Sequence, residues 1–160
     1  MKQLRSLWRF LTVPKETNTE KPVPHAAVPI NELEQIIGIK ELVTQQDFLD
    51  VLTLEWAIIY MQVEWSGPER SSRSCVYNAL NEIGVAGTPV FKIECSDQTK
   101  RYIVDWLIEQ KRDKADIYYG GSGETLLLNK GNIIEHIRYP AGIGYAGTKE
   151  KLMKWKNVTG

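Results

Sequence analysis

The chain has 160 residues, of which 42% are hydrophobic and 25% charged, so it is long enough for one domain with a buried core. Its 20 lysines and arginines balance 20 aspartates and glutamates, and no overall positive field would attract nucleic acid. Two cysteines and two histidines are too few for a disulfide framework or a Cys/His zinc cluster. We therefore expect no metal, no cofactor and no nucleic-acid partner.

Residues 1–30 are predicted to be an appendage to a domain formed by residues 31–160. Residues 1–12 place leucines and a tryptophan at helical spacing between basic residues, which predicts a small basic amphipathic helix. It could dock on its own domain, or make a weak contact with a membrane surface or a protein complex. Residues 13–30 hold four of the seven prolines, as a semi-extended linker does. Without an apolar run of about 18 residues or a secretory cleavage pattern, a cytoplasmic location is the default expectation.

Extended and helical patterns alternate from the start of the predicted domain. Asn31 is predicted to cap a short helix, and a strand follows over residues 39–43. Thr44 is predicted to cap a helix over residues 45–52. The near-continuous apolar run over residues 56–63 indicates a central strand that is covered on both faces.

The second half of the chain continues this alternation. A helix is predicted over 69–83, ending at Gly84, and a strand over 88–95. A helix over 99–112, capped by Ser96 or Asp97, leads to a flexible loop over 120–123 and to hairpin strands over 124–129 and 133–137. A glycine-rich loop over 140–147 and a closing helix capped by Thr148 complete the chain. This order predicts an α/β fold, in which a parallel sheet is finished by an antiparallel hairpin and carries helices on both faces.

The stretch Glu64-Trp65-Ser66-Gly67-Pro68-Glu69-Arg70, between an apolar strand and a helix, resembles the active-site segment of the thioredoxin family. The sequence VFKIE at 90–94 resembles the third strand of that family, and TLLL at 125–128 with the following Lys-Gly turn resembles its hairpin. The resemblance covers about residues 38–157. It implies a thioredoxin-like three-layer sandwich with a central mixed sheet.

The chain departs from the family at the residues that carry its chemistry. Thioredoxins need two cysteines that flank Gly-Pro, the first of them as a thiolate, and these positions hold Ser66 and Glu69. The buried aspartate of the family falls on Tyr60, and its cis-proline falls on Glu124. A cis bond before Glu124 would cost about 3 kcal/mol, so we expect a trans peptide there. Thiol–disulfide exchange by the usual route is therefore excluded.

The first functional hypothesis is a redox-inactive protein-binding module, of adaptor or chaperone type, with no catalytic residue. By the resemblance, a protein or extended peptide segment would bind where thioredoxins hold their substrates, partly through backbone hydrogen bonds that need no cysteine. The predicted contact residues are Trp65, Ser66, Gly67, Pro68, Glu69, Arg70, Thr88 and Glu124.

Two alternatives are enzymatic. Cys75 or Cys95 could exchange thiols in a non-standard way, although Cys75 is expected to be a small buried residue and Cys95 to be core or partly buried. Ser66 could instead support a glutathione-linked reaction, which the loss of the cis-proline at Glu124 disfavours. His136 is predicted to be a surface residue of the hairpin, and nothing ties it to Ser66 in a catalytic arrangement.

Overall fold

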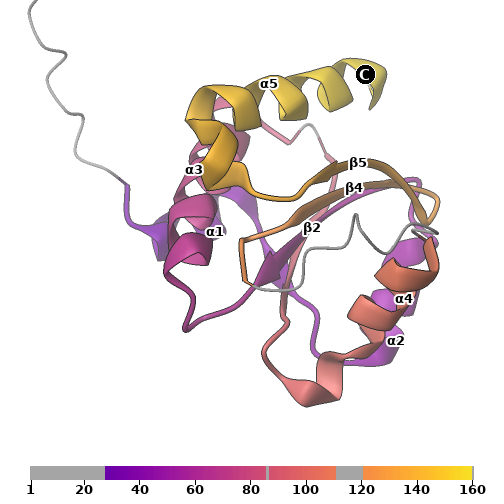
Figure 1. The fold of residues 1–160 in the computed structure, drawn as a ribbon. Coiled ribbons are helices and arrows are strands. Elements are labelled where there is room, and N and C mark those ends of the chain that lie inside the picture. The colour runs from indigo at the N-terminus through magenta and orange to yellow at the C-terminus, as the bar shows by residue number, and fades with distance from the viewer. Residues whose placement is uncertain (1–27, 86, 111–120, 160) are drawn as a thin grey trace, which may run out of the picture.

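A mixed sheet of five strands forms the centre of the computed structural model, which describes residues 28–85, 87–110 and 121–159 (Figure 1). The strands are β1 (Lys40–Glu41), β2 (Trp56–Gln62), β3 (Val90–Glu94), β4 (Thr125–Asn129) and β5 (Asn132–Ile137). They lie in the order β1-β3-β2-β4-β5. The first three strands in this order run parallel, whereas β4 is antiparallel to β2 and β5 is antiparallel to β4.

The register of the central strands brings three chain segments to one edge of the sheet. Gln62, the last residue of β2, pairs with Glu94, the last residue of β3. Thr125, the first residue of β4, lies opposite Tyr60 near the end of β2. The segments that follow β2 and β3 and the segment that precedes β4 therefore meet, as connections at the carboxyl edge of a parallel sheet do.

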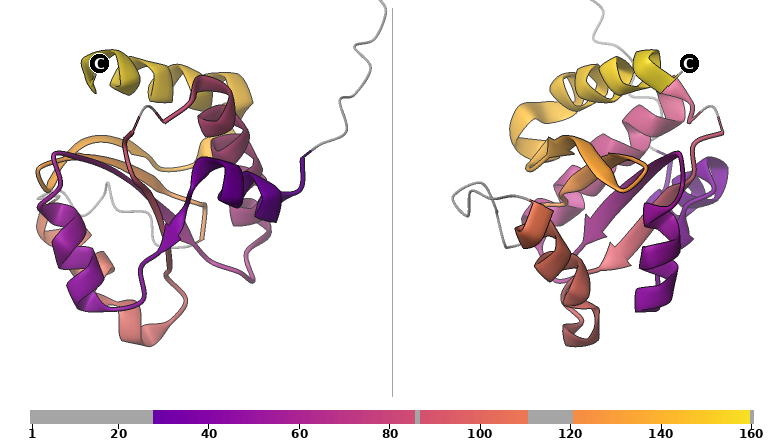
Figure 2. Two further views of the ribbon diagram at one scale, coloured as in Figure 1. Left: turned by 180° about the vertical axis from the view of Figure 1, so that it is seen from behind. Right: turned by 90° about the vertical axis from the view of Figure 1, so that its right-hand side faces the viewer.

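Helices cover both faces of the sheet (Figure 2). They are α1 (Ile30–Ile37), α2 (Gln45–Leu52), α3 (Gly67–Ile83), α4 (Tyr102–Gln110) and α5 (Pro140–Thr159), with a 3-10 turn η1 (Gln98–Lys100) before α4. One core layer joins β2 and β4 to α1, α3 and α5, and the other joins the opposite side of these strands to α2 and α4. The predicted three-layer sandwich with a mixed sheet and a C-terminal hairpin is confirmed.

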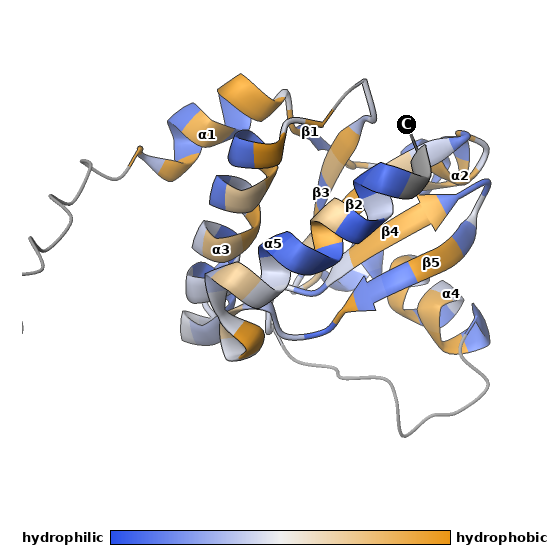
Figure 3. Cartoon of the chain, turned by 90° about the horizontal axis from the view of Figure 1, so that it is seen from above, coloured by the Kyte–Doolittle hydropathy of each residue, from blue (hydrophilic) through white to orange (hydrophobic). Residues whose placement is uncertain are grey.

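The hydrophobic patterns explain which strands are central. The residues from Ala57 to Tyr60 in β2 are fully buried, because each face of this strand packs on a helical layer. β4 is likewise largely hydrophobic, whereas the edge strand β5 mixes polar and apolar residues (Figure 3). The predicted caps are confirmed at Thr44, whose hydroxyl and Asp47 form a capping box on α2, and at Gly84, which ends α3.

Three predictions at element ends are wrong. Asn31 does not cap α1, because Pro29 takes the N-cap position. The strand predicted over residues 39–43 is reduced to the two residues of β1. The helix predicted from Thr99 begins instead with η1, although Asp97, one of the two predicted caps, is confirmed: its carboxylate accepts a hydrogen bond from the Thr99 N–H at 2.9 Å.

The glycine-rich loop predicted over residues 140–147 is helical. Pro140 begins α5, where a missing N–H leaves no helical hydrogen bond unmade. The helix is interrupted at Gly144, whose φ of 72° and ψ of 175° suit glycine. Thr148 is not an N-cap; it is buried within α5 and donates its hydroxyl proton to the Pro140 carbonyl oxygen over 3.1 Å.

Residues 1–27, which include the predicted basic helix, lie outside the described residues, as do Gly120 and the last two residues of the helix predicted over 99–112. Val28 and Ile30 pack against the core layer that contains α3. Within the described ranges, none of the helices has the length and apolar character needed to cross a bilayer.

Candidate functional site

The Gly-Pro turn joins the end of β2 to the start of α3, and Ser66 is the N-cap of that helix. The Ser66 hydroxyl oxygen accepts a hydrogen bond from the Glu69 N–H at 3.3 Å, and the hydroxyl donates its proton to the Gly121 carbonyl oxygen. Pro68 lies in the first turn, where its missing N–H is tolerated. Ser66 therefore stands at the position of the attacking cysteine of thioredoxins. It is a buried helix cap, and its hydroxyl proton is already donated to a backbone carbonyl.

The position of the second cysteine holds Glu69, whose side chain is 0% exposed. The Tyr60 hydroxyl donates to Glu69 Oε1 over 2.6 Å. Arg73 completes a two-pronged contact, with Nε donating to Oε1 over 2.8 Å and Nη2 to Oε2 over 2.7 Å. Burial, reinforced by the hydrogen bond to Glu69, raises the pKa of Tyr60 well above its usual range. The two departures from the family at Tyr60 and Glu69 therefore compensate each other in one buried network.

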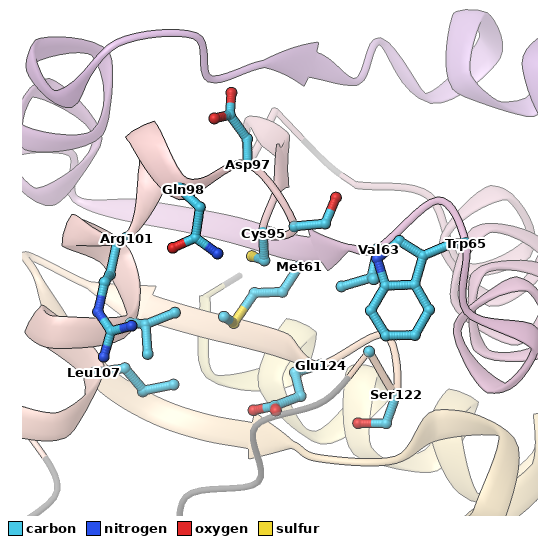
Figure 4. A pocket seen from close by; sticks show the side chains of 14 residues that line it. Met61, Val63, Trp65, Cys95, Asp97, Gln98, Arg101, Leu107, Ser122 and Glu124 are labelled. Carbon is cyan, nitrogen blue, oxygen red and sulfur yellow. The ribbon is translucent and has the colours of Figure 1, made fainter.

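A groove of about 380 Å³ lies beside the turn (Figure 4). It is bordered by the end of β2, the Trp65 indole, the segment after β3, α4 and the segment before β4. Its lining residues are Met61, Val63, Trp65, Cys95, Ser96, Asp97, Gln98, Arg101, Val104, Leu107, Gly121, Ser122, Gly123 and Glu124. Trp65 is 72% exposed, the largest exposed fraction among the exposed large hydrophobic residues that the structure describes.

The segment before β4 is packed into this site. Gly121, Ser122 and Gly123 are buried, and the prediction of a flexible loop does not describe them. Gly123 has a φ of +72°, and a Cβ there would lie 2.5 Å from the Tyr60 hydroxyl oxygen and from Ser72 Cβ, so the chain needs glycine at this point. No cis peptide bond occurs among the described residues, as expected for Glu124.

Glu124 lies at the floor of the groove and contacts His136 on β5. Glu124 Oε2 and His136 Nε2 are 2.6 Å apart, and the two side chains are 5% and 4% exposed. The prediction of His136 as a surface residue is wrong, because β5 pairs His136 with Leu126, whose side of the sheet is covered by α2 and α4. A bulge opposite Leu127 and Leu128 shifts the register of β5. The simple alternation of side chains along a strand therefore does not predict which face of the sheet His136 lies on.

The eight predicted contact residues fall into three groups: four are exposed, three are buried near the turn or the groove, and Thr88 lies elsewhere. The exposed ones are Trp65, Gly67, Pro68 and Arg70, and of these Trp65 lines the groove. Ser66, Glu69 and Glu124 are buried, so Ser66 and Glu69 support the turn from inside, while Glu124 reaches the groove.

Thr88 does not join the other predicted contact residues. The residue that follows it, Pro89, accepts a hydrogen bond from the Ile58 N–H at 3.1 Å, at the start of β2. Parallel pairing therefore puts Thr88 at the opposite end of the sheet from the turn. The residues that replace it in the groove follow β3, from Cys95 to Gln98, and sequence reasoning missed them. Their position after a parallel strand was the available signal.

Both cysteines are free thiols and are half-buried. Cys95 lines the groove, and burial, together with the nearby carboxylates of Glu94 and Glu124, raises its pKa to about 12. Cys75 lies on α3 in a surface hollow beside Tyr145, so the prediction of a small buried residue is wrong, and partial burial raises its pKa as well. Neither thiol has the lowered pKa that activates a thioredoxin cysteine. Within the described ranges no cluster of three metal-ligating side chains occurs.

The sheet order, the helix that starts at a Gly-Pro turn and the groove between the ends of β2 and β3 and the start of β4 define a thioredoxin fold. Comparison with solved structures agrees. The chain is similar to spinach chloroplast thioredoxin f in its long form, with 16% identity, a TM-score of 0.55 and coverage of 81% of this chain and 97% of that one. It is also similar to a thioredoxin from Nicotiana alata (11% identity, TM-score 0.52, 72% and 90% covered). Thioredoxin O1 from Arabidopsis thaliana gives 10% identity, a TM-score of 0.51 and coverage of 72% and 95%.

These similarities concern the fold, because the sequence identities are low. No family model matches the sequence, and no curated protein matches it either. The chain is thus a divergent thioredoxin-fold protein that carries Trp-Ser-Gly-Pro-Glu-Arg where the resemblance places the two cysteines.

Proposed function

We propose that this protein is a redox-inactive module that binds a protein partner, with an extended segment of the partner lying in the groove beside Trp65. The observation that carries the proposal is the exposed Trp65 indole at the mouth of a groove with apolar walls. Exposed tryptophans beside a pocket are frequent hot spots of protein interfaces. Burying one partner side chain among Met61, Val63 and Leu107 would contribute about 1.5–3 kcal/mol.

The contacts of the turn support binding over catalysis. The Ser66 proton is held by the Gly121 carbonyl, and no described base contacts the hydroxyl. Glu69 is enclosed by Tyr60 and Arg73, away from any substrate. These contacts keep the turn in one conformation and leave Trp65 presented to solvent. The turn therefore works in the proposal as a rigid support for a binding surface.

Neither enzymatic alternative is favoured by a contact in the described residues. Glutathione-linked chemistry would need the Ser66 hydroxyl to face the groove with an available proton. Thiol exchange at Cys95 would need a thiolate, which its raised pKa opposes at neutral pH. A cytoplasmic adaptor or chaperone-type role, with residues 1–12 as a tether to a complex or a membrane surface, remains part of the proposal.

Affinity capture with the full chain tests the proposal. Trp65→Ala removes the indole from the mouth of the groove, and Ile36→Ala is the matched control, since Ile36 is 58% exposed on α1. We expect the captured partner to be lost with Trp65→Ala and retained with Ile36→Ala, while both variants unfold at the temperature of the parent chain. Equal capture by the two variants would contradict the proposal.

A further inference from the structure

We propose that the segment bound in the groove carries a positively charged side chain, an arginine or a lysine, whose head group reaches the Glu124 carboxylate. This inference rests on the proposed function and adds the chemistry of the partner. It begins from Glu124, a carboxylate that is buried and still lines the groove. A buried charge without a compensating partner is unfavourable, and a ligand that supplies the opposite charge gains from pairing with it.

His136 contacts one oxygen of the Glu124 carboxylate. His136 Nδ1 is buried and has no hydrogen-bond partner. Its other ring nitrogen, Nε2, lies 2.6 Å from Glu124 Oε2, so His136 fixes the orientation of the carboxylate that lines the groove.

The surface next to the groove is also rich in acceptors. A polar pocket of about 270 Å³ shares Asp97 with the groove and is lined in addition by Glu64 and Glu94. The Gln62 amide oxygen, buried in the same lining, has no hydrogen-bond partner. A cationic segment crossing from the groove would therefore meet carboxylates along its path.

The basic side chains that the structure describes in this region are already paired. The two lysines of the polar pocket contact glutamates on β1 and α1: Lys100 Nζ is 3.5 Å from Glu41 Oε1, and Lys92 Nζ is 2.8 Å from Glu34 Oε2. Arg101 is the basic residue among the described residues that line the groove, and its Nε lies 3.5 Å from Asp105 Oδ1. Among the described residues of the groove and the polar pocket, acidic side chains therefore outnumber basic ones.

Trp65 suits the same ligand. Trp65 and Glu124 line one groove (Figure 4), with the indole largely exposed and the glutamate buried. An arginine or lysine stem can pack on the indole while its charged end extends toward a carboxylate, and a cation near an indole face is attracted to it. A bare metal ion fits less well, since the described residues offer no cluster of three ligands.

The test uses three extended peptides of equal length and identical apolar flanks, with arginine, glutamine or glutamate at the central position. Binding to the full chain is measured by titration calorimetry. We expect the arginine peptide to bind about tenfold more tightly than the glutamine peptide, and the glutamate peptide to bind most weakly. Added salt should weaken the arginine peptide most.

Glu124→Gln keeps an acceptor for His136 and removes the charge, so the preference for arginine over glutamine should disappear. Glu55→Gln is the matched control, because Glu55 is exposed just before β2, at the opposite end of the sheet. Glu64→Gln, an exposed substitution at the rim, should lower the preference by a few-fold even if Glu124→Gln fails to fold.

The outcomes separate the two proposals. If all three peptides bind equally to the parent chain and Trp65→Ala abolishes binding, the proposed function stands and the inference is overturned. If the arginine preference is present but survives both Glu124→Gln and Glu64→Gln, the inference is also overturned. If none of the peptides binds, the groove does not take extended segments, and both the proposed function and the inference fail.

Discussion

The buried network at the turn makes a strong prediction about stability. Arg73→Met would remove both hydrogen bonds that the guanidinium donates to Glu69 and leave that carboxylate, 0% exposed, with the Tyr60 hydroxyl as its remaining side-chain partner. Breaking a buried pair from one side typically destabilises a protein by about 3–5 kcal/mol, because the remaining charge stays buried. We expect a loss of that size in the free energy of unfolding, measured by urea denaturation.

The converse variant, Glu69→Leu, should lower the free energy of unfolding by less than Arg73→Met does. In Glu69→Leu the guanidinium of Arg73, whose side chain is 17% exposed, can turn toward water. The Tyr60 hydroxyl retains the Glu69 main-chain carbonyl oxygen, 3.1 Å away, as an acceptor. The double variant Glu69→Leu, Arg73→Met should be more stable than Arg73→Met alone, since replacing a buried ion pair by apolar residues is often neutral.

A matched control exists on α5. Lys154 and Glu150 have the same spacing of four residues and an Nζ–Oε1 distance of 2.8 Å, but their side chains are 72% and 67% exposed. Lys154→Met should change stability little, because exposed pairs contribute little. If Arg73→Met and Lys154→Met have the same small effect, the network does not stabilise the turn and the reasoning is refuted.

Further predictions concern the glycine at the site, the thiols and redox activity. Gly123→Ala should lower the urea midpoint more than Gly87→Ala, because both positions have a positive φ but a Cβ meets nothing within 4 Å at Gly87. Cys95 should react slowly with iodoacetamide at neutral pH and faster only as the pH approaches its pKa of about 12, where the thiolate forms; rapid alkylation at pH 7 would contradict this. The chain should fail to reduce a protein disulfide catalytically, and Cys75→Ser, Cys95→Ser should retain the captured partner. Reduction that this double variant loses would overturn the redox-inactive proposal.

The proposed tether has its own prediction. A chain of residues 28–160 keeps Val28 and Ile30, which pack against the core, and removes the basic segment. If that segment acts as a tether, the shortened chain should bind a groove peptide with unchanged affinity and lose retention in the complex or on the membrane surface. A shortened chain with unchanged retention would remove the tether from the proposal, and weakened peptide binding would show that the segment contributes to the groove.

The fold could be predicted because its signals are local. The apolar run of β2, the capping box at Thr44 and the Gly-Pro turn each act within a few residues, and their order along the chain matches one architecture. The site was harder, because it depends on pairs distant in sequence. Tyr60 and Glu69 were identified as departures from the family, but their hydrogen bond appears only when the end of β2 lies against the first turn of α3.

The misplaced residues show which information sequence patterns lack. Thr88 is predicted to be a contact residue but lies at the opposite end of the sheet from the turn, since a strand pattern does not state where the strand begins relative to its parallel neighbour. The sequence predicts His136 at the surface, whereas the bulge in the hairpin, which a strand pattern does not show, turns its side chain inward. Both errors concern register, which is set by the assembled sheet.

Backbone amide chemical shifts of the full chain, recorded by NMR during titration with the arginine peptide, test the binding claim most directly. The account predicts saturable shifts that concentrate on Trp65, on the segment from Cys95 to Gln98 and on the segment from Gly121 to Glu124. These shifts should be absent in Trp65→Ala and retained in Ile36→Ala. Shifts that concentrate on α5, or that persist unchanged in Trp65→Ala, would contradict a groove that binds extended segments beside Trp65.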